Sequence, residues 1–326
     1  TSGSIIISAT DAGTNTDHYA ISEGSTTSIT ANQNIIFQGA SLAAATPGSL
    51  TSAAGAVTPV FATANTGAAM SGPDATHTLS WAGAMTATNG YVSLNGHSSI
   101  SGIVSGKLLI ASAATYALTN TSNNISTVAA NVNSGSLTLT NGSVLTIGTV
   151  NSITGLTVPT LTLTTAGLSG SADITSTSSS TIQVINSSGS STYSGAIAGP
   201  IAITKSAAGT QILSGSNSYT GTTTVSGGVL QLNTAGSLGS ADVAVSATLN
   251  FNLTSATSYS NGFSLTSNGT LLNIGSGAVT LTGVVNTNAT STTLLDGGTA
   301  GLIISGNATP TGSGAAYYVK GAITFT

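Results

Sequence analysis

The chain has 326 residues, of which 3% are charged, and it contains three lysines, no arginine and no cysteine. An ordinary soluble domain carries about 25% charged residues. Nucleic-acid binding draws its affinity from clustered Lys and Arg, so we predict no nucleic-acid partner. Ser, Thr, Gly or Asn interrupts every apolar run within a few positions, so no transmembrane segment of about 20 apolar residues is predicted. Without cysteine, stability has to come from packing and backbone hydrogen bonds.

Residues 1–100 are predicted to form an irregular N-terminal β region with long loops or a cap. Between residues 38 and 77, three prolines and many Ala and Gly weaken the alternation of apolar residues. No signal peptide is visible, and we interpret Thr1 as the start of a processed or excised segment.

The densest ionisable patch of the sequence lies in this region and contains Asp11, Asp17, His18 and Glu23. Oxygen and imidazole ligands together could bind a metal ion. We interpret the patch as a solvated terminal loop instead, and we predict no metal site and no cofactor.

Residues 101–326 are predicted to consist of short β-strands. In residues 137–140, 161–164 and 279–282 an aliphatic residue alternates with threonine, which is the period-two pattern of a half-buried strand. Asn141-Gly142, a strong turn dipeptide, separates two such runs. No segment of the chain predicts a convincing helix. The whole chain is therefore expected to be all-β.

Two architectures suit short strands that recur every 8–12 residues: a parallel β-solenoid and an antiparallel β-sandwich. Aromatic residues make up only 4% of the chain, whereas a sandwich core usually uses bulky residues. Stacked rungs also place like side chains roughly 4.8 Å apart, a spacing at which like charges repel, so the scarcity of charge favours a solenoid. We predict the solenoid, with about 20–25 residues per rung, and keep the sandwich as the alternative.

The most patterned stretch, residues 204–232, reads TKSAAGTQILSGSNSYTGTTTVSGGVLQL. It resembles the passenger-associated transport repeat of bacterial autotransporters, whose pattern is K-x-G-x-G-T-L-x-L-S-G-x-N-x-Y-x-G-x-T-x-V-x-x-G-x-L-x-L. Ala207 stands in place of a glycine, and Gln211 stands in place of an apolar residue. Residues 136–168 resemble, more weakly, filamentous-haemagglutinin-like secreted proteins. Both resemblances imply a right-handed parallel β-helix at the bacterial surface.

Under this resemblance the motif residues have structural roles. Asn217 is expected to occupy a left-handed corner and bond the backbone there, and Tyr219 is expected to lie along a turn with its hydroxyl reaching a partner or solvent. The remaining positions divide into glycines at rung corners and apolar residues that pack, namely Gly209, Gly215, Gly221 and Gly228, and Ile212, Val225, Val229, Leu230 and Leu232.

A search for catalytic residues gives none. Enzymes that cleave glycans on a β-helix need carboxylates clustered on one face, but Asp173, Asp242 and Asp296 lie 69 and 54 residues apart in turn-like contexts. Asp173 and Asp242 share the frame Ser-Ala-Asp, which suggests equivalent corners of separate rungs. The histidines His18, His77 and His97 have no ligand-like spacing. We therefore predict no enzyme activity and no catalytic, cofactor-binding or metal-binding residue.

The leading hypothesis is a non-enzymatic structural or adhesive protein of the bacterial cell surface, a stiff extracellular rod or fibre. One alternative is a subunit that polymerises into an extracellular filament or surface layer, because the chain ends on an apparent strand, residues 317–325, that could pair further. Another alternative is a carbohydrate-binding or carbohydrate-active β-helix. The expected partners are further copies of the chain, and a host surface or glycan.

Overall fold

The computed structural model describes residues 84–94, 96–266, 269–287, 292–310 and 316–326, together with eight strands that precede residue 84. The chain folds as two compact units, Thr1–Thr164 and Thr165–Thr326. The division predicted between residues 100 and 101 stays a prediction, because much of the segment 1–100 lies outside the described residues.

All elements of the described residues are β-strands, which confirms the predicted all-β class. The first unit contains β1 (Ile5–Ser8), β2 (Ala20–Ile21), β3 (Ile29–Ala31), β4 (Ile35–Gly39), β5 (Ser41–Leu42), β6 (Leu50–Ser52), β7 (Val57–Phe61), β8 (Leu79–Trp81), β9 (Met85–Leu94), β10 (Ser98–Ile100), β11 (Val104–Ile110), β12 (Ala114–Leu118), β13 (Asn124–Asn131), β14 (Gly135–Ile147), β15 (Thr149–Val150), β16 (Ile153–Thr154) and β17 (Leu156–Thr157).

The division between the units falls within β18 (Thr160–Gly170). The second unit contains β19 (Ile174–Thr175), β20 (Ser180–Val184), β21 (Ser190–Tyr193), β22 (Ile197–Gly199), β23 (Ile201–Lys205), β24 (Thr210–Leu213), β25 (Ser218–Tyr219), β26 (Thr223–Val225), β27 (Val229–Leu232), β28 (Val243–Val245), β29 (Thr248–Phe251), β30 (Thr257–Tyr259), β31 (Phe263–Leu265), β32 (Thr270–Asn273), β33 (Val279–Leu281), β34 (Val285–Thr287), β35 (Thr292–Asp296), β36 (Leu302–Ile304), β37 (Ala308–Pro310), β38 (Ala316–Lys320) and β39 (Ile323–Phe325). No helix of the described part of the chain is long and apolar enough to cross a membrane.

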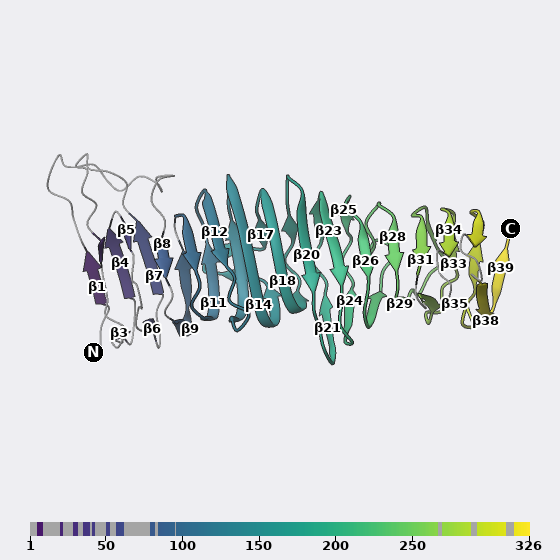
Figure 1. Ribbon diagram of the computed structural model, residues 1–326, viewed down its shortest axis with the longest axis horizontal. Coiled ribbons are helices and arrows are strands. Elements are labelled where there is room, and N and C mark those ends of the chain that lie inside the picture. The colour runs from purple at the N-terminus through teal and green to yellow at the C-terminus, as the bar shows by residue number, and fades with distance from the viewer. Residues whose placement is uncertain are drawn as a thin grey trace. The chain divides into compact units, whose positions relative to one another are not determined.

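The strands of the second unit form three parallel stacks, which the chain visits in turn (Figure 1). Stack 1 contains β21, β24, β27, β29, β32, β35 and β38. Stack 2 contains β19, β22 and β25 and, after a rung that has no strand at this position, the separate four-stranded sheet β30, β33, β36 and β39. Stack 3 contains β20, β23, β26, β28, β31, β34 and β37.

One passage through the three stacks is a rung, and successive rungs make a parallel β-solenoid, as predicted. In stack 3 the directly paired residues are Ile203, Thr223, Val243, Phe263, Val285 and Ala308, so the rungs are 20, 20, 20, 22 and 23 residues long. The antiparallel sandwich is therefore wrong. The right-handed sense of the coil stays a prediction, which the general preference of parallel crossovers supports.

Apolar side chains of the three stacks meet inside the coil. The ring of Phe251 in stack 1 lies 5.4 Å from that of Tyr259 in stack 2 and 6.4 Å from that of Phe263 in stack 3, between ring centroids. Inward positions that pair from rung to rung, such as Leu230, Leu249 and Leu271, are 0% exposed. Because each strand alternates inward and outward residues, the period-two pattern of the sequence builds this core directly.

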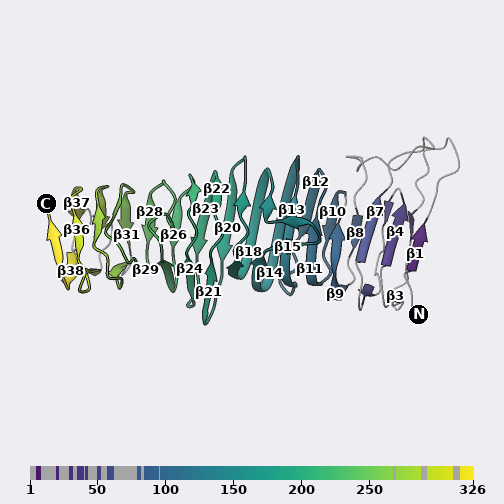
Figure 2. The same ribbon diagram turned by 180° about the vertical axis from the view of Figure 1, so that it is seen from behind.

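The first unit uses the same parallel pairing. Val92, Leu108, Val128 and Ile147 are register partners on β9, β11, β13 and β14, and all are 0% exposed. The antiparallel hairpin β15–β16 is an addition to this pattern. It lies against β13 (Figure 2). Val150 of the hairpin packs there with the outward-facing residues Leu109 and Ala129.

The turn predicted at Asn141-Gly142 is wrong, because β14 runs through both residues. The buried side chain of Asn141 accepts a hydrogen bond from Ile125 N at 2.8 Å and donates to Ile125 O at 3.1 Å. Its amide thus pairs with the preceding rung as a peptide group would. The strand can therefore continue through Asn141 and Gly142 without a turn.

Gly199 and Gly189 give a matched test of how closely the rungs pack. Both have positive φ, at 101° and 72°, but a Cβ on Gly199 would overlap the carbonyl oxygen of Ser176, whereas no described atom lies within 4 Å of a Cβ on Gly189. We expect Gly189→Ala to lower the free energy of unfolding by about 1–2 kcal/mol. We expect Gly199→Ala to lower it by at least about 3 kcal/mol, because overpacking adds to the same backbone strain. Urea unfolding measures both, and equal losses would contradict this packing.

Candidate functional site

The segment that resembles the transport repeat begins in β23 and completes one further rung through β24, β25, β26 and β27. Besides Thr223, two polar residues of this segment are buried, Lys205 and Gln211, at 0% and 1% exposure. They lie on consecutive strands, on either side of the corner that connects stack 3 to stack 1. We treat this rung as the candidate functional site because it holds both the repeat pattern and these buried polar side chains.

Lys205 occupies an inward position of stack 3, between the buried valines Val184 and Val225. Its Nζ donates hydrogen bonds to the carbonyl oxygens of Ser206 at 2.8 Å, Ala207 at 2.8 Å and Gly227 at 3.1 Å. Removal from water lowers the pKa of the ammonium group below its ordinary value. Within the described residues Lys205 forms no ion pair, so backbone carbonyls alone compensate its charge.

Ala207 is the first departure from the repeat pattern, which has a glycine at this position. Its φ is 64°, in the left-handed region that glycine adopts most readily. The strain of an alanine there is roughly 1–2 kcal/mol, and the bond from Lys205 Nζ to the Ala207 carbonyl oxygen holds the corner in this conformation.

Gln211 is the second departure, and its side chain reaches across three rungs. Its Oε1 accepts from Leu168 N and from Ser191 Oγ, both at 2.9 Å. Its Nε2 donates to the carbonyl oxygens of Leu168 at 3.0 Å, Ser191 at 3.2 Å and Ile212 at 3.0 Å. Every polar atom of the amide is therefore satisfied, which is what burial of a polar group requires.

The predicted roles of the motif glycines are confirmed at the corners. Gly228 has a φ of 61°, and the other three, Gly209, Gly215 and Gly221, leave no room for a Cβ next to the preceding rung. The predicted backbone bond of Asn217 is also present, because its Oδ1 accepts from Ile197 N at 2.9 Å. Its predicted left-handed conformation is wrong, since the described non-glycine residues with positive φ are Asn151 and Ala207.

Tyr219 differs from its predicted place along a turn. It lies in β25 of stack 2, is 0% exposed, and its hydroxyl forms a 2.8 Å hydrogen bond with Thr223 Oγ1. Among the predicted packing residues, Val225, Leu230 and Leu232 are buried, while Ile212 and Val229 flank the core on the outer face.

The aspartates predicted as turn residues each accept a backbone hydrogen bond. Asp173 Oδ1 accepts from Ala196 N at 2.8 Å, and Asp242 Oδ1 accepts from Gly262 N at 2.9 Å, in each case in the following rung. The bonds are equivalent but the corners are not, because Asp173 precedes β19 of stack 2 and Asp242 precedes β28 of stack 3. The two Ser-Ala-Asp segments therefore share a hydrogen bond from the Asp carboxylate to the next rung, but the prediction that they occupy equivalent corners is wrong.

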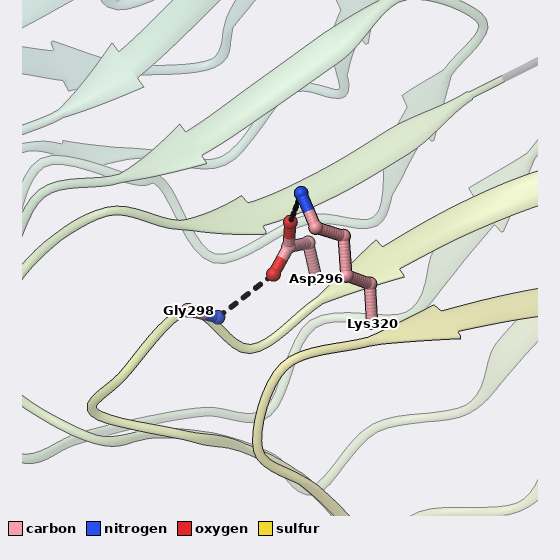
Figure 3. Close-up of polar contacts among 3 residues, drawn as sticks. All are labelled: Asp296, Gly298 and Lys320. Carbon is pink, nitrogen blue, oxygen red and sulfur yellow. Dashed lines mark hydrogen bonds and ion pairs between the residues drawn. The ribbon is translucent and has the colours of Figure 1, made fainter.

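Asp296 lies at the end of β35 in stack 1 (Figure 3). Its Oδ1 accepts from Gly298 N at 2.9 Å, and its Oδ2 lies 3.4 Å from Nζ of Lys320, its register partner on β38. The Lys320 side chain is 68% exposed, so this ion pair contributes little stability. The three aspartates thus adjoin strands of three different stacks.

Several of the residues weighed in the sequence lie outside the described residues, namely Asp11, Asp17, His18, Glu23 and His77. His97 is described, and its Nδ1 accepts from Thr115 N at 3.2 Å. The described part of the chain holds no group of three His, Cys, Asp or Glu side chains that could bind a metal ion. The absence of catalytic and metal-binding residues stays a prediction.

The interior also holds tyrosines whose phenols are removed from water. Burial raises the pKa of Tyr116, Tyr193, Tyr219 and Tyr259, and the neighbouring charge of Asp173 raises that of Tyr193 further. The hydroxyl of Tyr193 donates to Ala172 O at 2.6 Å.

These tyrosines predict a loss of stability in alkali. The unfolded chain ionises its phenols above pH about 10, while the folded chain keeps them neutral, so the free energy of unfolding is fully present below that pH and falls above it. The lowered pKa of Lys205 makes the free energy of unfolding rise with pH in the same range, but this single group is outweighed by the four tyrosines. We expect Tyr193→Phe to reduce the loss by about 1.4 kcal/mol per pH unit, measured by urea unfolding between pH 8 and 11. Phenolate absorbance of these residues in the folded protein would contradict the assignment.

Gln211→Glu tests the buried amide. The substitution replaces the Nε2 donor by a carboxylate oxygen that faces three carbonyl oxygens. We expect a loss of about 3 kcal/mol at neutral pH, partly recovered in acid, where the carboxyl group is protonated. Gln231→Glu is the matched control, because Gln231 lies on the outer face of the next rung. Equal losses in the two variants, measured by denaturant unfolding, would show that the amide contacts are unimportant.

The comparisons with known proteins agree with this placement. Residues 203–232 match the family model described as passenger-associated-transport-repeat. No curated protein and no solved structure gives a match. The matched residues begin in the strand that carries Lys205 and end with β27, so the pattern corresponds to the rung built above. Residues 203–232 are therefore a passenger-associated transport repeat within a parallel β-solenoid, a combination that fits an autotransporter passenger repeat protein.

Proposed function

We propose that the protein is a non-enzymatic structural and adhesive component of the bacterial cell surface. The observation that carries the proposal is the transport repeat at residues 203–232, because its family implies a secreted or cell-surface protein. The solenoid supports a scaffold role, since backbone pairing between successive rungs stiffens the stack of rungs.

The placement of the ionisable groups supports a role without catalysis. Glycan-cleaving enzymes need two carboxylates that flank one bond, whereas Asp173, Asp242 and Asp296 adjoin three different stacks and each binds a backbone amide. The outward residues are mostly uncharged Thr, Ser and Asn, which can form hydrogen bonds with sugar hydroxyls. Host glycans are therefore the first ligands to test for adhesion.

A second candidate function is self-assembly through the strands β38 and β39. Val319 and Phe325 are 47% and 51% exposed, whereas their register partners Leu295 and Ile304 are 0% and 1% exposed. Pairing of further strands with these two, from the same chain or from a second copy, would cover the inward side chains, and self-assembly is the case in which a second copy supplies them.

One set of experiments tests both candidates. Antibodies should label intact bacteria that produce the protein, external protease should remove the label, and beads coated with purified protein should bind glycan-bearing host cells. Beads coated with the destabilised Gly199→Ala variant are the control for binding that depends on the folded solenoid. Label that appears only after lysis would contradict the surface proposal.

Sedimentation of the purified chain over a hundredfold dilution separates the candidates. An unchanged monomer supports the structural and adhesive protein, and polymers that the Val319→Lys substitution disperses support self-assembly.

A further inference from the structure

Two of the buried polar residues of the transport repeat, Lys205 and Gln211, stand at positions that later rungs fill with aliphatic side chains. The inward position of Gln211 in stack 1 is taken by Leu230, Leu249 and Leu271 in the three rungs that follow. The position of Lys205 in stack 3 is likewise taken by Val225 and then Val245. Both polar residues belong to one stretch, β23 followed by β24, and both are almost fully buried.

Aliphatic stacks by themselves define the register of parallel strands weakly. A slip of one residue would turn the apolar side chains outward, but a slip of two residues would keep them inside. Each strand has two inward residues, which are Leu230 and Leu232 in β27 and Leu249 and Phe251 in β29. A two-residue slip would therefore place one large apolar side chain where another had been.

Gln211 and Lys205 distinguish the two registers because their partners are specific atoms. Gln211 forms five hydrogen bonds with Leu168, Ser191 and Ile212, and Leu168 lies 43 residues earlier, two rungs away. Lys205 reaches in the other direction, to Gly227 of the next rung. A two-residue slip would separate Gln211 from Leu168 and Ser191, so its buried amide would lose four of its five hydrogen bonds. Lys205 would lose its bond to Gly227 and keep those to Ser206 and Ala207, which belong to its own corner. Both losses disfavour the slipped state, and that of the buried amide does so by at least about tenfold.

We propose that Lys205 and Gln211 form a register lock, in which one polar rung fixes the alignment of the rungs before and after it. Gln211 aligns β24 with the two preceding rungs, and Lys205 aligns β23 with β26. Single buried polar residues fix the register of coiled coils in the same way, by penalising every alignment except one.

Disulfide trapping tests the lock, because the chain contains no cysteine of its own. Thr192 and Ile212 are outward-facing register partners on β21 and β24. Parallel strands lie about 4.8 Å apart, within reach of a disulfide, whereas a two-residue offset separates Cα atoms by about 8 Å, beyond its limit of about 7 Å. The pair Thr192→Cys with Ile212→Cys therefore reports the native register, and Thr192→Cys with Thr210→Cys or Ser214→Cys reports a slip.

Each pair is refolded from denaturant, oxidised and quantified by peptide mass spectrometry, in the otherwise native chain and in a Gln211→Leu background. We expect only the native pair in the native chain, and at least about tenfold more slipped disulfide with Gln211→Leu. Gln231→Leu, on the outer face of the next rung, is the matched control and should leave the native pair dominant. Native disulfide alone in the Gln211→Leu background would overturn the lock.

Lys205→Met provides a second, independent test, should Gln211→Leu fail to refold. The carbonyls that Lys205 contacts belong to corner residues that are not buried, so water can replace the ammonium group and the variant is expected to fold. Here Thr204 and Thr224 report the native register of β23 and β26, and Thr204 with Thr222 or Ser226 reports a slip. The exposed Lys107→Met substitution is the control. Slipped disulfide no more abundant than in that control would overturn the proposal.

Discussion

Backbone pairing between successive rungs is the interaction on which the rest of this structure depends. Most strands of the second unit pair with a strand of the next rung, 20 to 23 residues along the chain in stack 3. Side chains at one position therefore stack on the same position of their neighbours, at roughly 4.8 Å. This constraint accounts for the composition, because stacked like charges repel and stacked bulky residues overfill the interior.

The corners are where this repetition has to be interrupted, and polar side chains carry out that task. Asn217 binds the backbone of both neighbouring rungs through its amide, and Lys205 binds three carbonyl oxygens at the corner that contains Ala207. Buried polar groups are stable in these places because their partners are fixed backbone atoms. The same property makes them informative about alignment, which the aliphatic stacks between them define weakly.

Charge in the described part of the chain follows the same logic. The aspartates bind backbone amides at separate corners, and the one buried lysine binds carbonyl oxygens. These four charges are each engaged with the main chain of their own or a neighbouring rung. A chain that engages its ionisable groups in this way is suited to a scaffold whose outer faces offer hydroxyl and amide groups to a partner.

Local pattern in the sequence was sufficient to predict much of the fold. Alternation of Leu or Val with Thr predicted the strands and their inward faces, and the resemblance to the transport repeat implied the glycine corners of residues 204–232. Asn141-Gly142 was wrongly assigned to a turn, because the partner of the Asn141 amide, Ile125, lies in another rung. Tyr219 was placed on a turn for the same reason, since Thr223 and the stack around it bury its ring.

The amino-acid sequence by itself determined which residues point inward, because that property depends only on neighbours along one strand. The tertiary structure alone decided what those residues meet. In the run Ile201-Ala-Ile-Thr-Lys205 the alternation already places Lys205 inside, yet its bond to the Gly227 carbonyl oxygen, and the contact of Gln211 with Leu168, follow from the alignment of separate rungs. Rung alignment is a non-local property, set by pairing and by corner geometry together, and the period-two pattern is identical in every two-residue register.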